Sequence, residues 1–178
     1  MITPRIALGL LGLVLLSPAG DHSKELHPIV VLTGSASGIE KPENLRLTSQ
    51  DEWEPVWKRH RANQTKPGTV FDSEQTPVID FANYMLIAVF LGATWNMEGI
   101  KVVDATDSES ETTIRLDLLT YQTGPSGDRV SPYVFIVMPL SRKPIVLQRD
   151  ARTLPQRAVG PPPIWEEFHR FDALPESR

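Results

Sequence analysis

The stretch YMLIAVFLG, from Tyr84 to Gly92, constrains the fold of this chain more than any other. It is apolar at both odd and even positions and rich in residues that favour β-structure, so both of its faces need cover. A strand of this kind lies in the interior of a sheet that is packed on both sides. The run YVFIVM, at 133–138, has the same character and predicts a second buried strand.

Shorter patterns predict the remaining strands. In TTIRLDLLTY, at 112–121, apolar residues alternate with polar ones, which is typical of a strand with one buried face. Apolar runs at 29–33, 100–104 and 145–148 are bounded by turn-forming residues and predict three more strands. Because the turns between these segments are short, we expect an antiparallel sheet of about five to six strands.

One main helix precedes the longest strands. Trp53, Val56, Trp57 and His60 recur at the spacing of one helix face, so we expect both tryptophans to be core residues. His60 falls in the last turn, where the helix C-terminus would favour a cationic imidazole, and we expect a structural role for it. A helix packed on an antiparallel sheet places the fold in the α+β class.

The start of this helix has two candidates. Ser49 with Glu52, and Asp51 with Glu54, each have the spacing of a capping box. Pro55 favours the later start, because a proline deep inside a helix lacks a donor and clashes with the preceding turn. We therefore expect Asp51 to cap the helix.

The N-terminus has the features of an export signal. Arg5 precedes an apolar run from Ile6 to Leu16, and the tripeptide at 17–19 supplies the small residues of a cleavage site. The run is shorter than the roughly 20 apolar residues that a membrane-spanning helix needs. We expect residues 1–19 to be a signal peptide and 20–28 a flexible leader, with an uncleaved anchor as the main alternative. The exported chain would be periplasmic or secreted, without stable membrane insertion.

Charge and cysteine content exclude several classes of partner. The chain has 22 acidic and 18 basic side chains, a formal net charge of −4, and shows no basic stripe. A nucleic-acid partner is therefore not expected. The sequence has no cysteine, so it forms no disulfide and carries no lipidated cysteine.

The segment VVLTGSASGIE, at 30–40, resembles the phosphate-binding turn of short-chain dehydrogenases. In that turn the last glycine lets a helix pack tightly on the strand beside the phosphates. Here Glu40 occupies that position and would face the anion, and Pro42 stops a helix from starting. No tyrosine of the chain has a lysine four residues later, as the catalytic pair of that family requires. The sequence predicts a strand end here and no nucleotide cofactor.

Patterns for nucleophilic catalysis and for metal binding are equally weak. The chain has no G-x-S-x-G motif, and Ser126 lies in the turn-like segment GPSGD. The acidic stretch at 104–115 lacks the glycine and the final glutamate of a calcium loop. His22 and His27 lie in the leader. Three carboxylates in or beside the loop at 63–77 have no fixed mutual distance, and they are Asp72, Glu74 and Asp80. We expect no catalytic residue, no cofactor and no metal.

Four aromatic residues are the candidates for contact with a partner. Trp95 lies in the predicted turn ATWNMEG. Trp165, Phe168 and Phe171 recur at a spacing of three, so one helical turn would present them together. They follow TLPQRAVGPPP, whose three consecutive prolines favour extended geometry. We expect 151–178 to be a proline-rich linker and short aromatic tail, detachable from the sheet domain, that docks on that domain or on a partner.

Four segments in order resemble a known family. GSASGI, DEWEPVWKRH, VIDFANYMLIAVFLG and SPYVFIVMPL are similar to the C-terminal domain family of the protease-complex subunit PrcB, from about Gly34 to Gln148. The domain at 29–150 is thus expected to be PrcB-like. The resemblance implies an exported accessory domain associated with a surface protease complex, and none of its motifs is catalytic. This chain departs from the family in lacking a lipobox cysteine and in its proline-rich tail, so lipid anchoring is not implied.

These observations predict a non-enzymatic exported domain that binds another protein. The resemblance implies a protease as that partner, which the domain would stabilise or modulate. The alternative is an extracytoplasmic module that binds a ligand or carbohydrate through Trp95. A hydrolase that uses the scattered carboxylates is a third hypothesis.

Overall fold

The computed structural model describes five stretches of the chain, which are residues 23–28, 30–62, 75–121, 127–152 and 160–175. The expected signal peptide at 1–19 and the residues His22, Asp72, Glu74 and Ser126 lie outside these stretches. Within them, no helix has the length and apolar character needed to cross a membrane.

The described stretches contain one helix and eleven strands. In chain order these are β1 Lys24–Glu25, β2 Val30–Gly34, β3 Glu43–Leu47, α1 Gln50–Arg61, β4 Tyr84–Phe90, β5 Thr94–Trp95, β6 Met97–Asp107, β7 Thr112–Thr120, β8 Arg129–Val130, β9 Tyr133–Pro139, β10 Ile145–Asp150 and β11 Trp165–Phe171.

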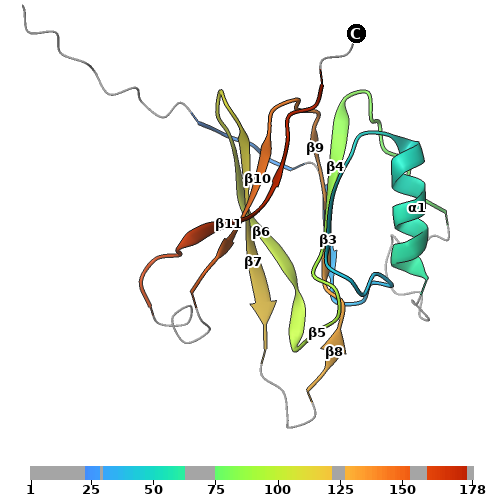
Figure 1. Ribbon diagram of the computed structural model, residues 1–178, viewed down its shortest axis with the longest axis vertical. Coiled ribbons are helices and arrows are strands. Elements are labelled where there is room, and N and C mark those ends of the chain that lie inside the picture. The colour runs from blue at the N-terminus through green and yellow to red at the C-terminus, as the bar shows by residue number, and fades with distance from the viewer. Residues whose placement is uncertain (1–22, 29, 63–74, 122–126, 153–159, 176–178) are drawn as a thin grey trace, which may run out of the picture.

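The elements form three layers (Figure 1). One sheet has the order β1-β6-β7-β10-β11, and a second has the order β2-β9-β4-β3. The two sheets pack face to face, and α1 covers the outer face of the four-stranded sheet. Strands β5 and β8 form a separate two-stranded ribbon. The molecule therefore has one core between the sheets and another beneath the helix.

The two apolar runs become the inner strands β4 and β9, as the sequence predicts. Alternate residues of β4 enter different cores: Met85 and Ile87 face the five-stranded sheet, whereas Leu86 and Phe90 face the helix. These side chains are completely or almost completely buried. The absence of a polar face in the sequence thus reflects cover on both sides.

Helix α1 buries the predicted face, and both Trp53 and Trp57 are core residues as expected. The predicted cap at Asp51 is wrong. Ser49 is the N-cap, with its hydroxyl accepting from the backbone N–H of Glu52 at 3.3 Å. The Glu52 carboxylate in turn accepts from the backbone N–H of Thr48 at 2.8 Å. The earlier start satisfies one free donor of the helix end, the Glu52 N–H, and one backbone donor just before the cap, the Thr48 N–H. Pro55 is accommodated inside the helix.

The sheet is more complex than expected. The coarse α+β prediction, one helix packed on a sheet, is confirmed, but the structure is mostly β and two packed sheets replace the single antiparallel sheet. The pair β7–β10 is parallel, with Ile145 opposite Thr112. The chain reaches β10 from β7 by way of β9 in the other sheet, a connection long enough to reverse its direction.

The leader at 20–28 is not wholly flexible. Strand β1 pairs with the end of β6, and Leu26 packs against the core between the sheets. The sequence predicted a short strand at 100–104, whereas β6 continues to Asp107 and so offers an edge to β1. The prediction was wrong here because the length of β6 was underestimated.

The expectation of a detachable helical tail is also wrong, whereas the alternative that the segment docks on its own domain is confirmed. Segment Trp165–Phe171 is strand β11, paired antiparallel with β10 at the edge of the five-stranded sheet. The register passes from His169 opposite Leu147 to Glu167 opposite Gln148, so Phe168 has no opposite residue. This bulge shifts the alternation of side chains by one position. Phe168 and Phe171, three residues apart, can therefore both pack on the core.

Hydrogen bonds from the main domain hold the chain beyond β11. The Arg46 guanidinium donates to the carbonyls of Lys143 at 3.1 Å and Asp172 at 2.9 Å, and also to that of Ser141. The backbone N–H of Leu174 donates to the carbonyl of Arg142 at 2.9 Å. The described C-terminal residues are thus part of the folded unit.

Candidate interaction surfaces

The GSASGI loop packs against the C-terminal end of α1. The Gly38 backbone N–H donates to the His60 carbonyl at 2.7 Å. A Cβ atom at Gly38 would lie 2.4 Å from the Arg59 carbonyl oxygen, so this close approach requires glycine. A helix C-terminus carries partial negative charge, whereas phosphate-binding turns use a helix N-terminus. The helix end beside this loop therefore carries a partial charge opposite in sign to that of the dehydrogenase turn, and it would repel a phosphate.

A buried serine–histidine pair completes this junction. His60 Nδ1 lies 3.0 Å from Ser37 Oγ, and Ser37 Oγ accepts from the backbone N–H of Ile39 at 3.1 Å. Burial, with a smaller contribution from Arg61, lowers the pKa of His60 to about 4, so the imidazole is neutral at pH 7. The expectation of a cationic histidine favoured by the helix end is wrong, because desolvation outweighs the helix dipole. The pair ties the loop to the helix.

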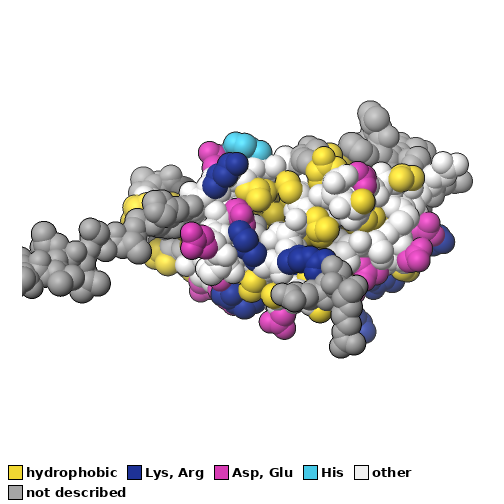
Figure 2. All heavy atoms as spheres, turned by 90° about the horizontal axis from the view of Figure 1, so that it is seen from above, with side chains coloured by type: hydrophobic (Ala, Val, Ile, Leu, Met, Phe, Trp, Pro, Cys, Tyr) yellow, Lys and Arg dark blue, Asp and Glu magenta, His cyan; other side chains and the backbone are white. Residues whose placement is uncertain are grey.

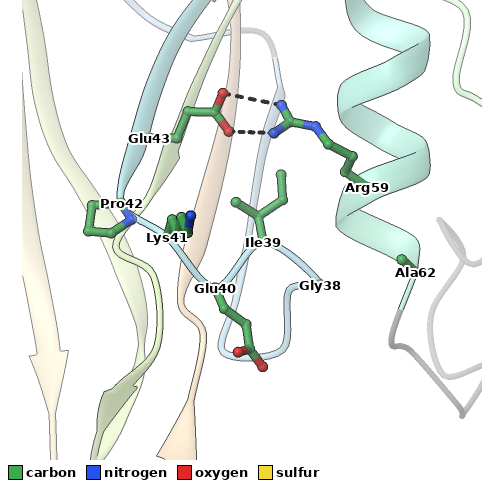
Figure 3. A pocket seen from close by; sticks show the side chains of 8 residues that line it. All are labelled: Gly38, Ile39, Glu40, Lys41, Pro42, Glu43, Arg59 and Ala62. Atoms are coloured by element: carbon green, nitrogen blue, oxygen red, sulfur yellow. Dashed lines mark hydrogen bonds and ion pairs between the residues drawn. The ribbon is translucent and has the colours of Figure 1, made fainter.

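A surface hollow of about 510 Å³ lies beside the same junction (Figure 3). Figure 3 shows the side chains of Glu43 and Arg59 directed toward one another, and their two hydrogen bonds measure 2.9 and 3.2 Å. Glu40 is engaged elsewhere, with Arg129 Nη2 at 3.0 Å. Glu43 and Arg59 thus neutralise each other, so neither is available to hold a charged ligand in this hollow, which Lys41 also lines.

A second, apolar groove lies between α1 and strand β2. Its volume is about 150 Å³. Its walls are formed by α1, by strands β2, β9 and β4, and by residues 77–79, which precede β4. The lining residues are Val30, Leu32, Trp53, Trp57, Pro77, Val78, Ile79, Leu86, Phe135 and Val137. The indole N–H of Trp53 donates to the Pro77 carbonyl at 3.0 Å, whereas Trp57 Nε1 has no hydrogen-bond partner among the described residues.

Strand β2 is an edge strand of the four-stranded sheet. At its end, Thr33 Oγ1 accepts from the backbone N–H of Ile100 at 3.1 Å and donates to the Ile100 carbonyl at 2.7 Å, so β6 covers this part. At its start, Val30 and Val31 are exposed, with 39% of Val30 accessible. An exposed apolar edge of this kind is a template for pairing with another strand.

The four aromatic candidates do not form one surface. Trp95 lies in strand β5 of the β5–β8 ribbon, rather than in the predicted turn, and its side chain is exposed. Trp165 lies on β11, where the Arg115 guanidinium sits 5.5 Å from its ring centre. Phe168 and Phe171 are half-buried against the core between the sheets. The two phenylalanines therefore have a structural role in the domain itself.

The remaining acidic candidates form turns and ion pairs. The stretch at 104–115 is the β6–β7 hairpin, in which Asp107 accepts from Thr112 Oγ1 and from Lys143 Nζ, each at 2.8 Å. Asp80 accepts from the side-chain amide of Asn83 at 2.8 Å. Across the described stretches, no three potential metal ligands gather at one point. Figure 2 shows acidic and basic side chains interspersed with hydrophobic ones on the face at the top of Figure 1.

Comparison with known proteins finds no matching family model, no matching curated protein and no matching solved structure. The resemblance to the PrcB family stays a prediction. Sequence reasoning missed the β2 groove and the Ser37–His60 pair. Both form from segments that are far apart in the chain, and no short sequence pattern predicts such contacts.

Proposed function

We propose that this chain is an exported, non-enzymatic domain that binds a protein partner by pairing a strand of that partner with β2. The observation that carries the proposal is the exposed apolar start of β2 beside an apolar groove. Strand addition of this kind takes affinity from main-chain hydrogen bonds and specificity from pockets for alternate side chains.

The groove lies on the side of β2 that a strand-adding peptide would use. Val30 and Leu32 both line it, and both stand on the helix-facing side of the sheet. Alternate side chains of an added strand would lie on this same side. A volume of about 150 Å³ suits one aliphatic or aromatic side chain. The expected ligand is therefore an extended, apolar, uncharged segment with a bulky residue at the groove.

The PrcB resemblance suggests the identity of the partner. We propose that the extended segment belongs to an extracytoplasmic protease complex, which the domain stabilises or modulates. Export rests on the signal-like residues 1–19. N-terminal sequencing of the protein from its host should give a start near residue 20, and cytosolic material that begins at Met1 would contradict export.

The interaction is tested with a matched pair of variants. Val30→Lys places a charge at the groove, and Val103→Lys places one on strand β6, where the valine is 44% exposed. The protein is incubated with a cell-envelope extract, the co-eluting protein is identified, and its affinity is measured by calorimetry. We expect Val30→Lys to weaken binding by about tenfold or more, because an edge charge opposes strand pairing, and Val103→Lys to leave it unchanged.

Hydrogen exchange then locates the contact. The amides of β2 should gain protection in the complex, while those of β3, at the opposite edge of the same sheet, should not. A partner that binds both variants equally, or a complex in which β2 is not protected, would refute strand addition. Failure of any protein to co-elute would argue against the protein-binding function itself.

A further inference from the structure

The ribbon β5–β8 presents an exposed aromatic ring on a fixed backbone. The Trp95 side chain is 58% exposed. Asn96, the next residue, has a φ of 55°, and its backbone N–H donates to the Asp128 carbonyl at 2.9 Å. Its side-chain oxygen accepts from the Asp128 backbone N–H at 2.8 Å. These hydrogen bonds fix the backbone next to the ring. A ligand that binds to the ring therefore pays little entropy for ordering the chain.

Two neighbours extend this aromatic surface. Gly127 has a φ of +60°, and a Cβ atom there would lie 3.2 Å from the Trp95 ring, so its backbone lies against the indole. Tyr121, which is also exposed, donates its backbone N–H to the Asn96 carbonyl at 3.0 Å. Its hydroxyl donates to the Asp128 carboxylate at 3.4 Å. The two rings are therefore joined through residues 127–128.

The charge beside these rings is negative. Asp128 accepts from the Tyr121 hydroxyl, and Glu98 is exposed on β6 directly after Met97, which lies opposite Thr120, the residue before Tyr121. In keeping with this placement, desolvation and the charges of both carboxylates raise the pKa of Tyr121. Within the described stretches, neither carboxylate forms an ion pair. Arg129, opposite Trp95 in the ribbon, is neutralised by Glu40 at 3.0 Å. This end of the domain combines exposed aromatic faces with two carboxylates that have no ion-pair partner among the residues the structure describes.

We propose that Trp95, Tyr121, Asp128 and Glu98 form a site for an arginine side chain of a protein partner. A guanidinium stacks on indole and phenol faces and pairs with carboxylates, and both interactions strengthen when water is excluded. A neutral sugar would use the rings but leave the two negative charges uncompensated. The site is separate from the β2 groove and does not depend on it.

The test uses a short arginine peptide as the probe. The ¹⁵N-labelled protein is titrated with acetyl-Gly-Arg-Gly-amide and, separately, with the citrulline peptide of the same shape and no charge. We expect the indole N–H resonance of Trp95 to shift saturably with the arginine peptide. The citrulline peptide should bind at least about fivefold more weakly, and salt should weaken the arginine peptide.

Variants separate the roles of ring and charge. Trp95→Ala should abolish the shifts at Tyr121, whereas Trp95→Phe should retain part of them. Glu98→Gln should weaken binding about threefold, and it leaves the hydrogen bonds of Asn96 in place. Ile164→Ala is the control, since Ile164 is 59% exposed but lies on the connection to β11.

Three results would overturn the proposal. They are equal affinity for the arginine and citrulline peptides, an unmoved Trp95 resonance, and unchanged affinity in Glu98→Gln. A titration with chito-oligosaccharide that moves Trp95 more than the arginine peptide does would assign the surface to carbohydrate instead. The β2 variant Val30→Lys should keep the arginine response, so the two proposals fail independently.

Discussion

Mild acid is expected to destabilise this fold through a single side chain, His60. Its ring is 1% exposed and lies among aromatic rings, with centroids 4.3 Å from Tyr133 and 5.4 Å from Trp57. Ser37 Oγ lies 3.0 Å from its Nδ1. Burial disfavours the cation, and the nearby charge of Arg61 does so further, which lowers the pKa to about 4. Protonation therefore opposes folding.

The direction and magnitude of this loss of stability follow from the linkage between proton binding and unfolding. The unfolded chain binds a proton at His60 with the ordinary pKa of 6.5, and the folded chain with a pKa of about 4. Between these values the unfolded state carries more protons, so the free energy of unfolding rises with pH. Integration from pH 7.5 down to pH 5 gives a loss of about 2 kcal/mol. Well below pH 4 the whole contribution, about 3 kcal/mol, is lost.

This pH window isolates histidine from the acidic groups. Ion pairing lowers the pKa values of Asp150 and Asp107 in the folded chain, although burial opposes the shift in both. Their stabilising contribution is therefore present above the unfolded aspartate pKa of 3.8 and is lost only below it. A change in stability between pH 7.5 and pH 5 is thus attributable to histidine.

The assay is urea unfolding followed by far-UV circular dichroism at several pH values in this window. The variants are His60→Gln and, as control, His27→Gln, whose imidazole is 81% exposed. The unmodified protein and the His27 variant should each lose about 2 kcal/mol, whereas His60→Gln should be nearly independent of pH. Each protein serves as its own reference, so the lower absolute stability of His60→Gln does not matter. A flat profile in the unmodified protein, or an unchanged slope in His60→Gln, would refute the reasoning.

Three further predictions concern the packing of the fold. Trp57→Ala should lower the free energy of unfolding by about 3–5 kcal/mol, because a large ring leaves a packed core; a loss below about 1 kcal/mol in denaturant unfolding would show that the ring contributes little. A chain ending at Arg152 should lose roughly 3 kcal/mol or more, because it lacks β11 and its two half-buried phenylalanines; an unchanged thermal midpoint would contradict the strand assignment. Arg46→Ala should lower the free energy of unfolding in urea by about 2–4 kcal/mol, since three carbonyls lose a charged donor. A loss within about 0.5 kcal/mol would show that water replaces the guanidinium.

The strands and the helix face could be predicted from local pattern. The apolar runs of β4 and β9 indicated burial on both faces, and alternation in β7 indicated one buried face. The spacing of Trp53 and Trp57 indicated which side of the helix enters the core. In each case the spacing of apolar side chains over about ten residues is enough to predict which face is buried, whatever the rest of the fold.

Local rules failed where two of them competed or where a bulge intervened. Pro55 opposed an early helix start, but the hydrogen bonds of Ser49 and Glu52 prevailed. The spacing of three in β11 indicated a helical turn, yet it arises from a bulge at Phe168. A bulge is specified by the partner strand, which the local sequence does not contain.

For the candidate sites, local sequence made Trp95 a candidate contact residue, because a large ring in a turn is hard to bury, but its exposure became known only from the fold. The tertiary structure alone brought Tyr121 and Asp128 to it, placed β2 at the sheet edge beside α1, and paired His60 with Ser37. These groups lie between 7 and 33 residues apart in the chain. Their meeting depends on which strands pair and in what register, and that is decided by the packing of whole sheets rather than by any short segment.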